Sequence, residues 1–290
     1  MRLRPAVAPR RISLLRVAIR RPSPDPAGLV ARGGLRARFG GYSALARWYR
    51  RLRPRYVWER VHPVGRATKR YVRENDLTVR RGPFTGLRYP PHAVGTVTHL
   101  TTKLLGCYES ALSPYLTDGG DFDLFVDVGA GDGYYCAGYK RLFPRTAVIG
   151  YETDASSRRM ALGLAQHNGV DVEMRGKADH RALSMLPEGH LLLLSDVEGY
   201  EYKLLDPVAV PRLLKATMII EVHPTARADI VEVLSRRFAV SHEITSVPGL
   251  PKDAGEFGEL AAWAEDEARY AISEGRDSEP LWLVMRPRAA

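Results

Sequence analysis

Carboxylates and an imidazole follow two stretches that have the composition of buried strands. Asp196 and Glu198 follow a run of four leucines and Ser195, and Gly199 then turns the chain. Glu221 and His223 end the next apolar run and share a face of it, because side chains alternate along a strand. Carboxylates at the mouth of a buried strand are costly unless they are paired, bound or used. The spacing therefore predicts a cluster that could act as a general base or hold a divalent cation.

A glycine-rich turn is the second candidate for chemistry. The segment 124–134 reads as a buried strand that contains Asp127, then glycines at every second position (Gly129, Gly131 and Gly133), then the start of a helix. A dinucleotide-binding turn needs its third glycine one residue later, for close packing of the helix. That position holds Tyr134, so the spacing argues against a dinucleotide.

The elements that must position these residues alternate between strand and helix from residue 124 onward. The predicted strands are 124–128, 147–152, 170–175, 190–196, 217–223, 239–247 and 280–286. The predicted helices between them are 133–143, 154–168, 179–185, 225–236 and 258–272. This alternation indicates a doubly wound α/β fold, in which ligands bind at the carboxyl ends of the strands. We expect the last strand to lie antiparallel at the edge of the sheet.

The glycine turn resembles the S-adenosylmethionine (SAM) loop of class I methyltransferases, whose sheet is a Rossmann-like, seven-stranded one. At the second strand end, Glu152 could accept hydrogen bonds from both ribose hydroxyls. After the third strand, Asp179 could accept from the adenine amino group or cap the next helix. Thr153 and Asp154 are predicted helix caps. The residues expected to bind the cofactor are Asp127, Gly129, Ala130, Gly131, Gly133, Glu152, Asp179 and Asp196.

Over residues 120–225 the chain resembles the FkbM-type methyltransferases. The matching pieces are 126–131 with Tyr134 and Tyr135, Glu152, the phrase Asp-Val-Glu-Gly-Tyr-Glu at 196–201, and Ile-Glu-Val-His at 220–223. The resemblance implies a SAM-dependent O-methyltransferase that acts on a hydroxyl of a sugar, a glycan or a secondary metabolite. The segment 103–109 looks like one that precedes the core in a subset of such proteins. The long basic N-terminus departs from the family pattern and leaves the acceptor open.

The expected catalytic residues are Asp196, His223 and Glu198. A hydroxyl acceptor must lose its proton, and His223 or Asp196 is the expected general base. A divalent metal held by Asp196, Glu221 and His223 is an alternative that we do not favour, so no metal is predicted. In a third reading, Glu198, Glu201 and His223 only form hydrogen bonds to loops or to nearby side chains, Tyr108 and Lys103.

The charge is divided unevenly along the chain. Of a net charge of +10, residues 1–81 carry +18, with 22 basic and four acidic residues, and the remainder carries −8. The expected organisation is a basic, disordered arm over 1–40, an extension over 41–117 that packs on the core, and a methyltransferase domain over 118–290. In the extension we expect a helix at 42–60, a hairpin at 77–89 and an amphipathic helix at 99–116 that could be kinked near Gly106.

Composition also narrows the location and the class of protein. Two cysteines without metal-ligand spacing, and no apolar run of about 20 residues, favour a reduced cytoplasmic protein without a transmembrane segment. The arginine-rich N-terminus could contact a membrane surface or nucleic acid. The alternatives are therefore an RNA methyltransferase that uses this arm, or a non-catalytic adaptor built on the same fold. The acidic body and the absence of an Asn/Asp-Pro-Pro-aromatic phrase argue against the first.

Overall fold

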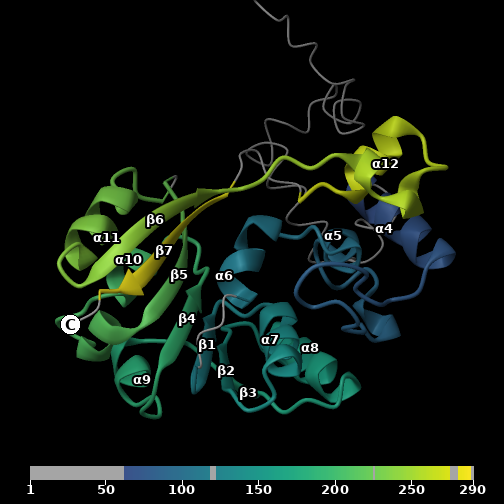
Figure 1. Ribbon diagram of the computed structural model, residues 1–290. Coiled ribbons are helices and arrows are strands. Elements are labelled where there is room, and N and C mark those ends of the chain that lie inside the picture. The colour runs from purple at the N-terminus through teal and green to yellow at the C-terminus, as the bar shows by residue number, and fades with distance from the viewer. Residues whose placement is uncertain (1–61, 118–121, 225, 275–279, 289–290) are drawn as a thin grey trace, which may run out of the picture. The chain divides into compact units, whose positions relative to one another are not determined.

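The computed structural model describes residues 62–117, 122–224, 226–274 and 280–288, and all of them belong to one compact unit (Figure 1). The predicted arm at 1–40 and the predicted helix at 42–60 lie outside the described residues. No helix among the described residues is long and apolar enough to cross a membrane.

The described residues form a seven-stranded mixed sheet, as predicted. Its strands are β1 Leu124–Val128, β2 Ala147–Tyr151, β3 Glu173–Arg175, β4 Leu191–Ser195, β5 Thr217–Val222, β6 His242–Pro248 and β7 Leu281–Pro287. Their order is β3-β2-β1-β4-β5-β7-β6, and the first five strands in this order are parallel. β7 is antiparallel to both β5 and β6. The Rossmann-like α/β prediction is confirmed, but the last strand is not at the edge: β7 lies inside the sheet and β6 is the edge strand.

The helices also follow the predicted alternation. They are α4 Pro63–Glu74, α5 Leu100–Leu105, α6 Ser113–Thr117, α7 Tyr134–Leu142, α8 Ala155–His167, α9 His180–Ser184, α10 Glu201–Leu204, α11 Ile230–Phe238 and α12 Glu265–Ala271. Short 3₁₀ turns are η1 Pro91–Ala93, η2 Ser110–Leu112, η3 Pro211–Lys215, η4 Ala254–Glu256 and η5 Gly258–Leu260.

The extension differs most from its predictions. The predicted helix at 99–116 is broken into α5, η2 and α6, because Gly106 ends α5 in the left-handed conformation at φ 77°. The predicted hairpin at 77–89 is present as a short antiparallel pair: the Tyr89 amide donates to the Leu77 carbonyl and the Val79 amide to the Leu87 carbonyl, both at 2.8 Å, around the bridge between Thr78 and Arg88. No predicted element covers α4, whose buried face includes Tyr71.

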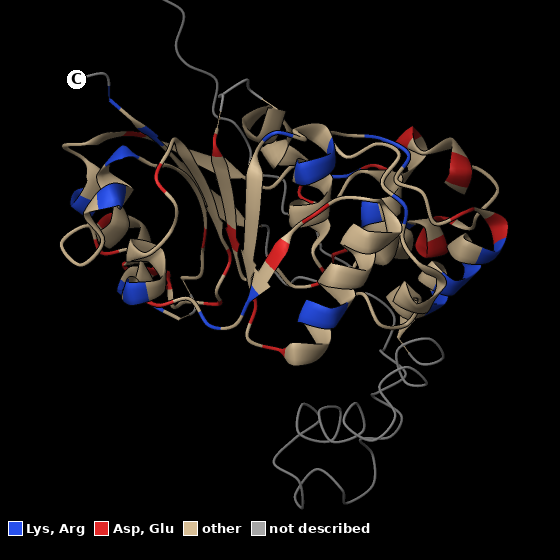
Figure 2. Ribbon diagram, turned by 90° about the horizontal axis from the view of Figure 1, so that it is seen from below, with Lys and Arg blue, Asp and Glu red and all other residues tan. Residues whose placement is uncertain are grey.

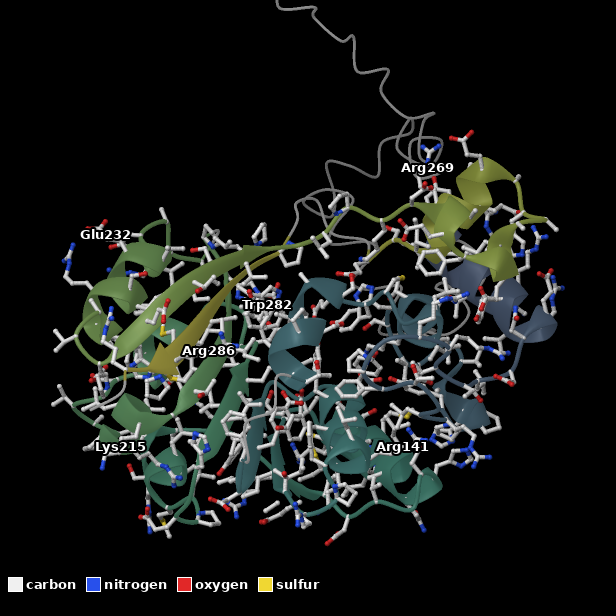
Figure 3. All side chains as sticks on the ribbon, viewed as in Figure 1. Arg141, Lys215, Glu232, Arg269, Trp282 and Arg286 are labelled. Carbon is white, nitrogen blue, oxygen red and sulfur yellow. The ribbon has the colours of Figure 1, made fainter. Side chains whose placement is uncertain are left out.

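The core lies in two layers, one on each face of the sheet. Alternate residues of one strand belong to different layers: Leu192 and Leu194 of β4 pack with the α7–α8 side, whereas Leu191 and Leu193 pack with the α9–α11 side. Figure 1 shows these helices on opposite sides of the sheet. Trp282 of β7 is 1% exposed and belongs to the α7–α8 layer (Figure 3). This double burial explains why the β4 sequence is a continuous apolar run rather than an alternating one.

The extension and the segment after β6 pack on each other. The Arg70 guanidinium lies 4.3 Å from the centroid of the Trp263 ring, and the Trp263 Nε1 donates to Glu74 at 2.8 Å. Arg81 binds Glu259 through two hydrogen bonds of 3.0 and 2.9 Å. Figure 2 shows basic α4 beside the acidic segment around α12. The extension and the segment after β6, which are far apart in the sequence, therefore pack together.

Candidate active site at the carboxyl ends of the strands

The glycine turn after β1 is held against its two neighbouring strands. The amides of Gly129 and Ala130 donate to the Tyr151 carbonyl of β2 at 2.8 and 3.0 Å. Gly129 has φ 94°, and a Cβ there would lie 1.8 Å from the Asp196 carbonyl oxygen at the end of β4. Only glycine allows the backbone segments to approach so closely. The turn therefore lies between the ends of β2 and β4.

Gly133 has a packing function. It caps α7 with φ 83°, and a Cβ there would lie 2.6 Å from the Cβ of Ala161 on α8. It thus allows the close approach of α7 and α8, and the cavity described next is not lined by it. The glycine spacing alone gave no signal that would separate this packing role from cofactor contact.

A cavity of about 410 Å³ opens at the carboxyl ends of β1, β2, β3 and β4, which is within the usual size of small-molecule sites. Its walls are Val128, Gly129, Tyr151, Glu152, Thr153, Gly176, Lys177, Ala178, Asp196, Val197, Glu198, Tyr200 and Leu204. Of the residues predicted to bind a cofactor, Gly129, Glu152 and Asp196 line this cavity. Ala130, Gly131 and Asp127 lie in or beneath the turn beside it.

Glu152 joins the turns that follow β1 and β2. Its Oε2 accepts from the Gly131 amide at 3.0 Å, and its Oε1 accepts from the Asp154 amide at 2.7 Å. A carboxylate offers about four lone-pair positions, so these two bonds and a longer one of 3.4 Å from the Thr153 hydroxyl leave room for a further donor. Asp154 caps α8 by accepting from the Ser157 amide at 2.7 Å, as predicted for that residue.

Asp127 lies beneath the turn. Its side chain is buried within β1, and the Cys136 thiol donates to its Oδ2 at 3.3 Å. Burial raises the pKa of Asp127 to about 7. Asp127 therefore titrates near neutral pH.

Asp179 is a helix cap in this structure. It is exposed, and its Oδ1 accepts from the Ala182 amide at 2.8 Å at the start of α9. The cavity wall at this strand end is made instead by Gly176, Lys177 and Ala178. Of the two alternatives for Asp179, the structure shows the cap.

The two strand ends predicted to be neighbours bring their polar side chains together. The His223 Nε2 lies 3.5 Å from Asp196 Oδ1, 3.6 Å from Glu198 Oε2 and 3.9 Å from Glu221 Oε1. Asp196 and Glu198 also line the cavity, so this cluster adjoins it. Glu198 has a positive φ of 54° and an 88% exposed side chain. A non-glycine residue in that region stores backbone strain, which is often found at functional sites.

Glu201 is a residue of the site that our catalytic prediction omitted. It is completely buried, and its Oε1 accepts from the His223 Nδ1 at 2.9 Å and from the Val197 amide at 3.2 Å. Lys103 pairs with Asp132 of the glycine turn rather than with this cluster. The signal for Glu201 was the last letter of Asp-Val-Glu-Gly-Tyr-Glu, at a position where a buried carboxylate requires a partner.

The hydrogen bond between His223 and Glu201 shifts the pKa of both partners. It raises the pKa of His223 to about 9, against the opposing effect of burial and with support from Glu221 and Asp196. Burial acts to raise the pKa of Glu201, but the hydrogen bond from His223 outweighs it and the net shift is downward. His223 is therefore an imidazolium at neutral pH, surrounded by carboxylates.

Among the described residues, one group of side chains could also hold a metal ion. The ligand atoms of Asp196, Glu221 and His223 lie within 4.8 Å of one another. The hydrogen bond that Nδ1 donates to Glu201 leaves Nε2 directed toward the carboxylates, as in many metal-bound histidines. The donor set fits a divalent cation, but a proton on Nε2 occupies the same position.

Comparisons with known proteins find similarity only to solved structures, and at low values. No protein-family model matches the chain, and no curated protein matches it either. It is similar to the structure of precorrin-6y C5,15-methyltransferase from Geobacter metallireducens, with 13% identity over 62% of this chain and 87% of that chain and a TM-score of 0.44. It is also similar to the O-methyltransferase TomG from Streptomyces achromogenes, in complex with SAM, with 13% identity over 58% and 74% of the two chains and a TM-score of 0.39. These values are too low to carry a functional assignment.

Proposed function

We propose that this protein is a SAM-dependent methyltransferase that methylates a hydroxyl oxygen. One observation carries the proposal: Gly129, Glu152 and Asp196 line the same cavity. A glycine turn, a carboxylate suited to a ribose diol and a carboxylate suited to an acceptor are thus within reach of one bound molecule. The resemblance to FkbM-type enzymes supports the same assignment.

The residues that line the cavity suggest which part of the cofactor each of them would contact. Gly129 would border the methionine part, and Glu152 would accept from the ribose hydroxyls. Lys177 and Ala178 would border the adenine, beside Tyr200, whose ring lies 5.2 Å from the Lys177 Nζ. The bound cofactor supplies an electrophilic methyl group on a sulfonium and leaves as the neutral thioether S-adenosylhomocysteine (SAH).

Asp196 is the proposed general base. With SAM bound, the acceptor oxygen would take the methyl group, and the electron pair of the broken carbon–sulfur bond would remain on sulfur. The hydroxyl proton passes to the Asp196 carboxylate. We assign this role to Asp196 rather than His223, because the raised pKa of His223 keeps the imidazole protonated at neutral pH.

His223 is proposed to balance the negative charge of the cluster. Its imidazolium lies within 4 Å of carboxylates from both strand ends and is oriented by buried Glu201. A divalent metal on Asp196, Glu221 and His223 would instead lower the pKa of a bound hydroxyl. Turnover that persists in EDTA supports the metal-free form, whereas loss in EDTA and recovery with Mg²⁺ or Mn²⁺ would assign the cluster to a metal.

The proposed acceptor is a sugar hydroxyl on a glycan or a secondary metabolite. Carboxylates accept hydrogen bonds and donate none, so the open side of the cluster suits a ligand rich in hydroxyl donors. Glu198, with its exposed side chain, would be the first carboxylate that such an acceptor meets.

The cofactor assignment is tested by calorimetric titration of the protein with SAH and, separately, with NAD. Binding of SAH alone supports the proposal, whereas no binding of SAH would revive the adaptor alternative. Labelled SAM is then incubated with the protein and with glycolipid, metabolite and RNA fractions. Label in the RNA fraction alone would overturn the hydroxyl-acceptor assignment in favour of RNA methylation.

A further inference from the structure

A buried lysine of the extension reaches the glycine turn. Lys103 lies on α5, its side chain is only 5% exposed, and its Nζ is 2.5 Å from Asp132 Oδ1. Asp132 stands between Gly131 and Gly133 and is the one polar side chain in the turn 129–133. The other carboxylate oxygen of Asp132 accepts from the Tyr89 hydroxyl at 2.6 Å. Both oxygens of Asp132 are therefore bound by residues of the extension.

The surroundings of Lys103 fix its position. Its ammonium lies 4.8 Å from the ring centroid of Tyr108 and 5.5 Å from that of Tyr134, the first residue of α7. A buried ammonium is costly without a counter-charge, so the pairing with Asp132 is strongly favoured over leaving either group alone.

The helix that carries Lys103, α5, is packed against the backbone of residues 80 and 81. Gly106, which ends α5 at φ 77°, packs so closely that a Cβ there would lie 2.2 Å from the Arg81 carbonyl oxygen. The Arg80 amide also donates to the Leu104 carbonyl at 2.7 Å. These contacts fix the position of α5 and therefore of the Lys103 backbone.

Within the turn, Gly131 has little packing of its own. Gly131 has φ 52°, and a Cβ there would meet nothing closer than the Gly129 carbonyl oxygen at 3.9 Å. Backbone bonds tie the turn to Tyr151 and Glu152 on the β2 side. On the opposite side, Asp132 supplies the polar side-chain ties, and they lead to the extension.

We propose that Lys103 and Tyr89 are positioning residues that, through Asp132, hold the glycine turn in the conformation that binds the cofactor. The inference rests on the proposed SAM site and deepens it: the extension sets the cofactor affinity of the core. Lys103 need not touch the cofactor for this effect, because it acts on the backbone of residues 131–133.

The first test is Lys103→Met, which keeps the side-chain length and removes the charge. Calorimetric titration with SAH should show at least tenfold weaker binding by a folded protein, and Tyr89→Phe should show a smaller loss of about two- to fivefold. Arg81→Met is the matched control, because it removes another tie of the extension, to Glu259, without touching the turn. Its SAH affinity should equal that of the wild type.

A double variant separates positioning from simple stability. Lys103→Met combined with Asp132→Asn leaves no unpaired buried charge, so its melting temperature should recover toward the wild-type value. Its SAH affinity should stay low, because the tie from Lys103 to the turn is still missing. Recovery of both would mean that Lys103 acts only on stability and would overturn the proposal.

A second measurement does not depend on cofactor. Amide hydrogen exchange of residues 129–134 should be faster in Tyr89→Phe than in Arg81→Met, even if Lys103→Met fails to fold. Equal exchange in the two variants would contradict the positioning role. Wild-type protein that binds no SAH would instead refute the proposed function, so the two failures are distinguishable.

Discussion

At the scale of single residues, the decisive group is Asp196, because it borders both the cavity and the His223 cluster. Asp196→Asn keeps the size of the side chain and removes the base. We expect turnover to fall at least about a hundredfold, the usual contribution of a general base, while SAH affinity stays nearly unchanged. Asp171→Asn, at an exposed aspartate, is the control and should leave both quantities unaltered. Wild-type turnover in Asp196→Asn would refute the assignment.

The charge of His223 predicts the pH dependence of turnover. With Asp196 as base and the imidazolium as its counter-charge, the rate should fall as pH rises through about 9, where His223 loses its proton. Glu201→Gln removes the main cause of the raised pKa, so the fall should move toward the ordinary value of 6.5. Rate profiles and NMR titration of the imidazole measure both effects. A rate that instead rises through pH 9 would identify His223 as the base.

The same raised pKa links stability to pH. Because the folded pKa of about 9 exceeds the ordinary value of 6.5, the stabilisation from His223 is fully present below 6.5 and is lost as pH rises through 9. Urea unfolding of the wild type and of His223→Gln should therefore differ most at pH 6 and converge toward pH 10. A difference that is constant across this range would contradict the linkage.

At the scale of elements, the packing of α7 on α8 depends on Gly133. Gly133→Ala places a Cβ against Ala161 in a left-handed conformation. We expect a loss of unfolding free energy of about 2 kcal/mol or more, from overpacking and backbone strain together. Gly169→Ala is the matched control, because φ is 64° there but nothing lies within 4 Å of the added Cβ. Urea unfolding should show a clearly smaller loss of unfolding free energy for Gly169→Ala. Equal losses in the two variants would contradict a packing role for Gly133.

At the scale of the whole molecule, Trp263 joins the extension to the segment after β6. It is 8% exposed and contacts both Arg70 and Glu74 of α4. Trp263→Ala should lower the unfolding free energy by about 3 kcal/mol, as is usual for a buried aromatic side chain. Tyr270→Ala, at a 40% exposed ring of α12, should change it by no more than about 0.5 kcal/mol. If the two substitutions had similar effects in urea unfolding, Trp263 would not stabilise the packing of the extension on the segment after β6.

The sequence predicts the structure best where a local pattern of residues and the burial of those residues agree. The apolar run of β4, the glycines that follow β1 and the carboxylates at the ends of β4 and β5 are local patterns, so strand, turn and site could be inferred from them. The position of β7 inside the sheet could not, because strand order depends on long-range pairing that leaves no local signature. The short length of α5 was missed for a related reason, since it depends on packing of the extension on the core.

Residue types and spacing alone determined that this chain has an α/β core, a glycine turn unsuited to dinucleotides and an acidic cluster at two strand ends. Only the tertiary structure decided which side chains meet. Glu201 sets the charge of His223 because the fold buries both together, and Gly133 packs helices because α8 crosses beside it. Lys103 pairs with Asp132, 29 residues away, because α5 lies against the turn. Such contacts arise from packing between distant segments, and a one-dimensional pattern does not encode them.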